Sequence, residues 1–113
     1  QQVADAVERI GGFPEVEIRP ILGAATRNRY RNKAQLPLGL NSKGELQMGC
    51  YSAHSHRIVN MGSCLLQPMV FTMAMEAFRE WHGECGGSVY HEKEHTGLLR
   101  HLYLRWGEKT GEV

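Results

Sequence analysis

The stretch YRNKAQLPLGLNSKGELQMGCY, residues 30–51, predicts an antiparallel β-hairpin around which the other elements can be arranged. Residues 30–38 and 45–51 both read as strands, and in the second strand apolar side chains alternate with polar ones as expected for one buried face. Residues 39–44 between them contain Gly, Asn and Ser, which favour a turn. We therefore expect two strands joined by a loop of about five or six residues.

Two helices flank this hairpin in the sequence. Residues 3–10 repeat apolar side chains at helical spacing and stop at the two glycines at positions 11 and 12. A second helix is predicted from Pro68 to Gly83. The apolar stripe of this second helix, which we interpret as core, consists of Met69, Val70, Met73, Ala74, Ala77, Phe78 and Trp81.

Three further segments complete the predicted fold. Residues 57–60 form a short strand, and residues 16–21 form either a short strand or an extended arm. Residues 98–106 alternate again, with Leu102, Leu104 and Trp106 inward and His101, Tyr103 and Arg105 outward. At 113 residues and 42% hydrophobic composition, the chain is about the size of one small domain. We predict an α+β fold, with an antiparallel β-sheet and two main helices packed on it.

The charged residues are unevenly distributed although the net charge is only +1. Six cations and no acidic residue lie between Ile18 and Gly44, whereas residues 76–94 hold five glutamates. In an extended strand, the cations at positions 27, 29, 31 and 33 would share one face with Gln35. Such a row suits a phosphate backbone, because arginine binds phosphate bidentately and stacks on unpaired bases.

The same row has a second interpretation, as a solvated strand face or a surface between domains. We favour contact with RNA. The residues nominated for RNA binding are Arg27, Arg29, Tyr30, Arg31, Asn32 and Lys33.

The cysteines and the apolar segments indicate in which cellular compartment the protein is located. Cys50, Cys64 and Cys85 leave one cysteine without a partner, and no signal-like segment is present, so we expect a cytoplasmic protein. The longest apolar stretch, residues 65–77, is too short and too mixed to span a bilayer, so we expect no membrane role. Taken alone, Cys64 is interpreted as a small buried side chain.

One motif resembles a zinc site. His91 to His95 read HEKEH, the H-E-x-x-H pattern in which two histidines on one helical face bind zinc. That chemistry needs a longer helix with an apolar back and a third ligand, so a charged loop is the better interpretation. His54 and His56 are likewise interpreted as part of a polar loop. No nucleophile elbow or glycine-rich phosphate loop occurs, and we expect no catalytic residue in this chain.

Three separated blocks together resemble the RNA uracil-5 methyltransferases that act on 23S ribosomal RNA and tRNA. They are YRNKAQLPLG (30–39), MGCYSAHSHRIVNMGSCLLQ (48–67) and HTGLLRHLYLRWGEKTGEV (95–113). The resemblance implies an S-adenosylmethionine-dependent enzyme with an N-terminal oligonucleotide-binding barrel, a central domain and a C-terminal Rossmann-like catalytic domain. Residues 1–113 resemble the central domain only, and the family's catalytic residues and methyl-donor site belong to the C-terminal domain.

The resemblance also implies a four-iron four-sulfur (4Fe-4S) cluster in the parent protein. In many members, three cysteines before the first helix and a fourth at the position of Cys64 hold such a cluster. Cys50 and Cys85 match no family ligand. One thiolate cannot assemble a cluster, so we expect no cofactor in this segment by itself.

The end of the sequence supports the interpretation as a segment. After the turn at residues 107–111 only two residues remain, so we expect the strand at residues 98–106 to have lost the strand that would follow it. We therefore expect a truncated central domain whose partners are RNA and its sister domains. The alternatives are a non-catalytic module that binds protein partners and, third, a zinc peptidase acting through His91 and His95.

Overall fold

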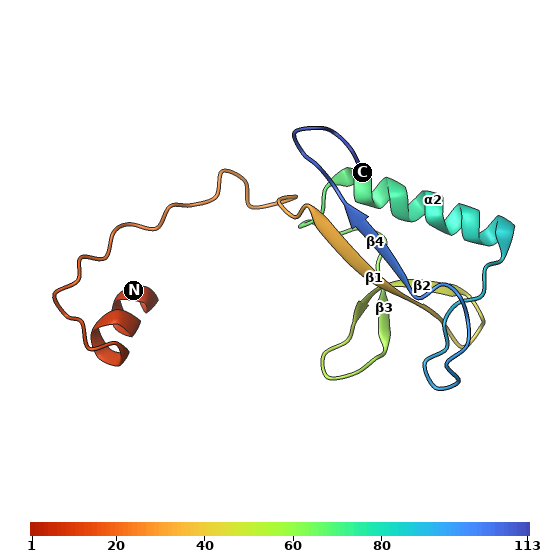
Figure 1. Ribbon diagram of the computed structural model, residues 1–113, viewed down its shortest axis with the longest axis horizontal. Helices are drawn as coiled ribbons and strands as arrows, with labels where there is room; N and C mark the ends of the chain where they lie inside the picture. The colour runs from red at the N-terminus through yellow and green to blue at the C-terminus, as the bar shows by residue number, and fades with distance from the viewer.

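A computed structural model describes all residues, 1–113, and has a four-stranded antiparallel sheet with one long helix across one face (Figure 1). The order of strands across the sheet is β3-β2-β1-β4. The predicted α+β class is confirmed. The elements are α1 (Gln2–Asp5), the π-helical η1 (Ala6–Ile10), β1 (Lys33–Leu40), β2 (Leu46–Tyr51), β3 (Ile58–Asn60), α2 (Met69–Cys85) and β4 (His101–Arg105).

The predicted hairpin is confirmed as β1 and β2. Leu38 pairs with Met48 and Leu40 with Leu46, so the connecting loop covers residues 41–45. The side chain of Asn41 accepts hydrogen bonds from the backbone N–H groups of Lys43 and Glu45, both at 2.9 Å, which is the local bonding expected of asparagine in a turn. β1 begins three residues later than predicted and ends two residues later.

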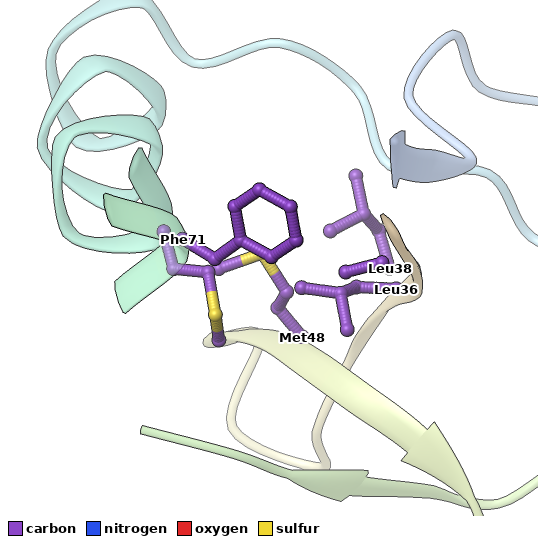
Figure 2. Close-up of a cluster of buried hydrophobic side chains, with 6 residues drawn as sticks. Leu36, Leu38, Met48 and Phe71 are labelled. Carbon is purple, nitrogen blue, oxygen red and sulfur yellow. The ribbon is translucent and has the colours of Figure 1, made fainter. Parts of the chain in front are cut away.

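The core lies between α2 and the middle of the sheet. Phe71 and Met75 of α2 are fully buried, as are Leu36 of β1 and Met48 of β2 (Figure 2). Burying each such side chain stabilises the fold by about 1.5–3 kcal/mol. The buried cluster consists of Ala34, Leu36, Leu38, Met48, Phe71 and Met75.

The stripe predicted for α2 is correct only in part: its Val70 and Phe78 pack against the core, but other members do not. Met69 and Met73 are 52% and 63% exposed, and the stripe omitted Phe71 and Met75, which are the buried residues of this helix. The first half of α2 is apolar on nearly every side, so periodicity alone did not select one face. The helix ends where predicted to within three residues, at a left-handed Gly86 with φ 65°.

The first helix lies apart from the sheet. α1 and η1 run without interruption to Ile10 and end at Gly11, as the sequence predicts, but neither contains a buried residue. Only α2 packs on the sheet, which corrects the expectation that both helices do so (Figure 1). Residues 16–21 form no strand, so of the two predicted alternatives the extended arm is correct. No helix in the molecule is long and apolar enough to cross a membrane.

The last strand, β4, finds its partner in β1. The two strands are antiparallel, with Ala34 opposite Leu104 and Leu36 opposite Leu102. Leu102, Leu104 and Trp106 pack against the core, as their alternation predicts. β4 lies at the edge of the sheet and pairs with β1 alone, so the expectation about a strand that would follow it stays a prediction.

Candidate nucleic-acid interface

The sheet face opposite α2 presents polar and charged side chains from β1 and β4. Because Ala34 and Leu36 point into the core, Lys33 and Gln35 lie on the other face. Directly across from them in register are Arg105 and Tyr103. All four are exposed, and we call the set Lys33, Gln35, Tyr103 and Arg105 the sheet-face strip.

Two cations of the sheet-face strip face each other. Lys33 and Arg105 occupy paired positions of adjacent strands, an arrangement that is destabilising when like charges lie directly opposite. The two ion pairs of the molecule both involve histidine, so none of its 13 lysines and arginines is paired with a carboxylate. The Lys33 ammonium lies 5.9 Å from the centre of the Tyr103 ring. This site is therefore suited to an anionic ligand with an adjacent planar group.

The residues nominated ahead of β1 do not form a strand. Residues 27–29 form bends, and Arg29 has a left-handed backbone with φ 57°. The predicted alternation of Arg27, Arg29 and Arg31 on one strand face is therefore wrong, because β1 begins only at Lys33. These residues form no strand because the backbone N–H groups of Arg29 and Arg31 donate to the carbonyls of Leu65 and Leu66, which lie in a loop and not in a neighbouring strand.

Backbone hydrogen bonds hold this segment, residues 27–33, against the loop that follows β3. The N–H of Arg29 donates to the carbonyl of Leu65 at 2.7 Å, and the N–H of Arg31 donates to that of Leu66 at 3.0 Å. The side chains of residues 27–33 are all exposed, including those of Tyr30 and Asn32. We call residues 27–33 the basic segment; its backbone is fixed while its cations face solvent.

The same pairing brings Cys64 next to the basic segment. Cys64 directly precedes Leu65, is half-buried and is not in a disulfide. Cys50 and Cys85 are both exposed and lie on β2 and at the end of α2. No group of three His, Cys, Asp or Glu residues is arranged to hold a metal ion. The residues of this chain therefore do not by themselves fit an iron–sulfur cluster.

The HEKEH motif forms a turn and no helix. His91 and Thr96 close it as an antiparallel bridge, and His95 has a left-handed backbone with φ 53°. The helical premise of the zinc interpretation is therefore wrong, and the interpretation as a charged loop before a strand is confirmed. Nδ1 of His56 donates to both carboxylate oxygens of Glu92, at 2.8 and 2.7 Å. This hydrogen bond lowers the pKa of Glu92, and the nearby charges of His56, Arg100 and His95 lower it further.

Comparison with known proteins identifies relatives of the chain. It is 40% identical over 113 residues, the whole chain, to an uncharacterized RNA methyltransferase of Clostridium tetani. It is 41% identical over 112 residues to one from Gloeobacter violaceus and 39% identical over 113 residues to one from Bacillus cereus. The chain is homologous to a segment of the RNA methyltransferases. It spans about a quarter of these relatives, 24% in each case. No protein-family model matches it.

The sheet-face strip contains candidate residues that the sequence did not nominate. Tyr103 and Arg105 were expected to point outward, but only the β1–β4 register places them beside Lys33. Pairing between distant strands has no short-range signal, so the sequence could not reveal this neighbourhood. The structure thus brings together Lys33, Tyr103 and Arg105 on the sheet and places the arginines of the basic segment at the start of β1.

Proposed function

We propose that this chain is the RNA-holding central domain of an S-adenosylmethionine-dependent methyltransferase that methylates carbon 5 of uracil in 23S ribosomal RNA or tRNA. The names of the homologous RNA methyltransferases and the three sequence blocks support this proposal. In the parent protein an oligonucleotide-binding barrel would precede the domain, and a Rossmann-like catalytic domain would follow it. We propose a cytoplasmic location, because its three cysteines are unpaired.

The observation that carries the proposal is the in-register pair of Lys33 and Arg105 with no carboxylate partner. A phosphate between these two side chains would relieve their repulsion and would accept hydrogen bonds from both. The ring of Tyr103 beside them offers a face on which an unpaired base can stack. The exposed arginines of the basic segment extend the cationic surface beyond the end of the sheet.

The chemistry of methyl transfer belongs elsewhere in the parent protein. S-adenosylmethionine supplies an electrophilic methyl group on a sulfonium cation, and a sulfonium does not fit a surface made of unpaired cations. The residues of this chain would instead bind the phosphates of the RNA and fix its position. Methylation then requires that the target uridine be turned out toward the catalytic domain.

Cys64 is proposed as one ligand of a 4Fe-4S cluster in the parent protein. Its half-buried thiol and its place beside the basic segment are compatible with a cluster that anchors this loop. A cluster needs three more thiolates, which the parent protein would have to supply from outside this chain. Cys50 and Cys85 are exposed on other elements and are not part of the proposal.

Salt dependence of RNA binding tests the proposal. If Arg29, Arg31, Lys33 and Arg105 each contact one phosphate of a single strand, log affinity should fall against log salt with a slope of about −2.8. A fourfold rise in salt would then weaken binding roughly fiftyfold. The measurement is fluorescence anisotropy of a labelled single-stranded RNA at several salt concentrations. A flat salt response would contradict the proposal.

A second function, binding of protein partners, is favoured by the N-terminal region. Ile10, Ile21 and Leu22 are 87%, 83% and 97% exposed. Apolar side chains so exposed favour contact with another protein surface, for which the sister domains of the parent protein are the proposed partners. Two results together would favour this function. Substitution of the arginines of the basic segment would leave RNA affinity unchanged, and substitution of Ile10, Ile21 and Leu22 would abolish contact with the sister domains.

A further inference from the structure

A cleft of about 330 Å³ opens at the end of β1 that lies away from the basic segment. Its floor comes from residues 38–40 of β1 and Gln47 of β2. Its walls come from Tyr51 and residues 56–58, at the two ends of the connection from β2 to β3, and from the loop at residues 90–93. This volume is at the lower end of the range for small-ligand pockets, and it suits one planar group with one attached anion.

The two walls are joined by contacts between residues far apart in the sequence. His56 on one wall donates to Glu92 on the other, with a shorter distance of 2.7 Å. The His56 ring also lies against that of Tyr51, with ring centres 5.5 Å apart. These contacts shape the cleft before any ligand is present, which lowers the entropic cost of binding.

The cleft carries an excess of positive charge. Arg57, Lys93 and Arg100 line it, against one carboxylate, Glu92, which His56 already engages. Nη2 of Arg57 donates to the hydroxyl of Ser52 at 3.1 Å, and neither arginine is in an ion pair. A ligand of this cleft should therefore bring an anionic group to the arginines.

Aromatic rings line the cleft beside these cations. Tyr51 is 49% exposed, and the Arg100 guanidinium lies 4.7 Å from the centre of the Tyr90 ring. Tyrosine faces and a stacked guanidinium are the groups on which unpaired nucleic-acid bases stack. An inorganic anion or an acidic peptide would use the arginines but would leave the tyrosines without a planar partner.

The cleft is continuous with the sheet-face strip. On β1, Gly39 lines the cleft and lies on the same face as Lys33 and Gln35 of the strip, and Arg100, which also lines the cleft, directly precedes β4. The carbonyl of Arg100 accepts a hydrogen bond from the N–H of Leu38 at 3.0 Å, which fixes this corner to β1. A strand of RNA that follows β4 from Arg105 therefore arrives at the cleft.

We propose that this cleft binds one nucleotide of the RNA, with the base stacked on Tyr51 and the phosphate held by Arg57 and Arg100. The proposal rests on the proposed function, because it makes the cleft a second contact point for the same single strand. The basic segment and the sheet-face strip would bind phosphates of the RNA, and the cleft would bind one unpaired nucleotide of the same strand.

The first experiment is an NMR titration of the 113-residue chain with uridine 5′-monophosphate, and separately with inorganic phosphate. We expect the nucleotide to shift the amide signals of Gly39, Tyr51 and Tyr90. Phosphate alone should shift the Arg57 and Arg100 side-chain signals with little effect on the tyrosines. Equal responses to both ligands, or no response to either, would overturn the proposal.

The second experiment measures the affinity of a fluorescein-labelled ten-nucleotide uridine oligomer. Tyr51→Ala should weaken binding at least about fivefold, whereas Tyr51→Phe, which keeps the ring, should leave affinity unchanged. Arg57→Ala with Arg100→Ala should weaken it further. Arg9→Ala with Arg19→Ala, in the N-terminal region apart from the sheet, is the matched control for the loss of two cations.

The outcomes separate this proposal from the proposed function. If the oligomer binds with a steep salt slope but the cleft variants bind as well as the unaltered chain, the cleft proposal is overturned and the proposed function stands. If the nucleotide shifts the cleft signals but no RNA oligomer binds, the assignment of the cleft to RNA fails together with the proposed function. Melting temperatures of all variants within about 2 °C of the unaltered chain would exclude unfolding as the cause.

Discussion

Lys33 and Arg105 lie directly opposite each other on β1 and β4, on the face of the sheet that α2 does not cover, and no carboxylate pairs with either. Like charges at paired positions reduce stability by a few tenths of a kcal/mol. A sheet that retains such a pair beside an exposed tyrosine is better suited to bind an anion than to be stable alone. The Lys33–Arg105 pair therefore lowers the stability of the fold but favours binding of an anion.

Reversing one charge of this pair should raise stability and weaken RNA binding. Lys33→Glu places a carboxylate opposite Arg105, and an opposite-charge pair contributes about 0.5 kcal/mol. The melting temperature should rise by about 2–4 °C, and the salt slope of RNA binding should become shallower by at least about 0.7, the loss of one phosphate contact. Thermal unfolding and fluorescence anisotropy measure the two effects.

The matched control for this reversal is Lys109→Glu in the turn near the end of the chain. It changes the net charge by the same amount at a site away from the β1–β4 pair, so the melting temperature should not rise. If Lys33→Glu lowers stability, or if both variants weaken RNA binding equally, the local role of the pair is refuted.

The arginines of the basic segment should matter for binding and not for folding. Their backbone N–H groups are bonded to Leu65 and Leu66, whereas the Arg29 and Arg31 side chains are exposed and unpaired. Arg29→Ala with Arg31→Ala should make the salt slope shallower by about 1.4 and change the unfolding free energy by less than about 0.5 kcal/mol. Alanine keeps the Cβ at the left-handed position 29, so backbone strain is unchanged.

Arg9→Ala with Arg19→Ala removes the same charge from the N-terminal region and is the control for the double variant. This pair should leave the salt slope nearly unchanged. Should both double variants shift the slope alike, RNA binding would reflect overall charge and not the basic segment.

The sequence predicted the elements of the fold better than their arrangement. The hairpin of β1 and β2 follows from local alternation and turn residues, and its five-residue loop was expected. The pairing of β1 with β4 joins residues about 70 positions apart, and no local pattern encodes it. The buried face of α2 was predicted only in part, because apolar residues on several sides left the choice between Phe71 and Met73 to tertiary packing.

The candidate site was predicted in composition but not in geometry. The run of cations at residues 27–33 is exposed and free of carboxylates, yet it is not a strand, because the backbone of residues 29–31 bonds to another loop. Long-range contacts also place His56 against Glu92, a pair that spacing alone could not have suggested. The sequence therefore predicted which segment carries the cations. It did not predict which side chains lie next to one another, because that depends on contacts between segments far apart in the sequence.

Leu36 should be essential for stability because it fills the centre of the core. It is 1% exposed and lies in the cluster of Phe71 and Met48, so Leu36→Ala removes buried surface and leaves a cavity. The unfolding free energy should fall by about 2–5 kcal/mol in denaturant titration. Leu22→Ala removes the same atoms from a side chain that is 97% exposed, and should cost less than about 0.5 kcal/mol. Similar losses in the two variants would contradict the assigned core.

The Glu92 carboxyl should titrate at a lower pH than an ordinary glutamate. The hydrogen bond from His56 lowers its pKa, so the folded state favours the ionised form. A group with a depressed folded pKa contributes stability above its unfolded pKa and loses that contribution as pH falls through the folded pKa. The bond between the cleft walls should therefore persist at neutral pH and break in acid.

NMR titration of the Glu92 side-chain carboxyl carbon measures this shift. His56→Ala should move the midpoint up toward the ordinary glutamate value. His91→Ala removes a histidine that lies near Glu94, at 3.8 Å, and should leave the midpoint nearly unchanged. An unmoved midpoint in His56→Ala would show that the other charges, and not the hydrogen bond, set the pKa.

Cys64 should be required for iron in the proposed parent methyltransferase and insufficient for it in this chain. Cluster assembly needs four ligands, and no group of three candidate ligands lies together here. Reconstitution of the 113-residue chain with iron and sulfide should therefore give a colourless protein without stoichiometric iron.

In the parent protein, Cys64→Ser should remove most of the iron and the absorbance of the cluster. Cys85→Ser, at the exposed end of α2, should retain both, because its thiol is not among the proposed ligands. Full iron content in Cys64→Ser would remove Cys64 from the ligand set.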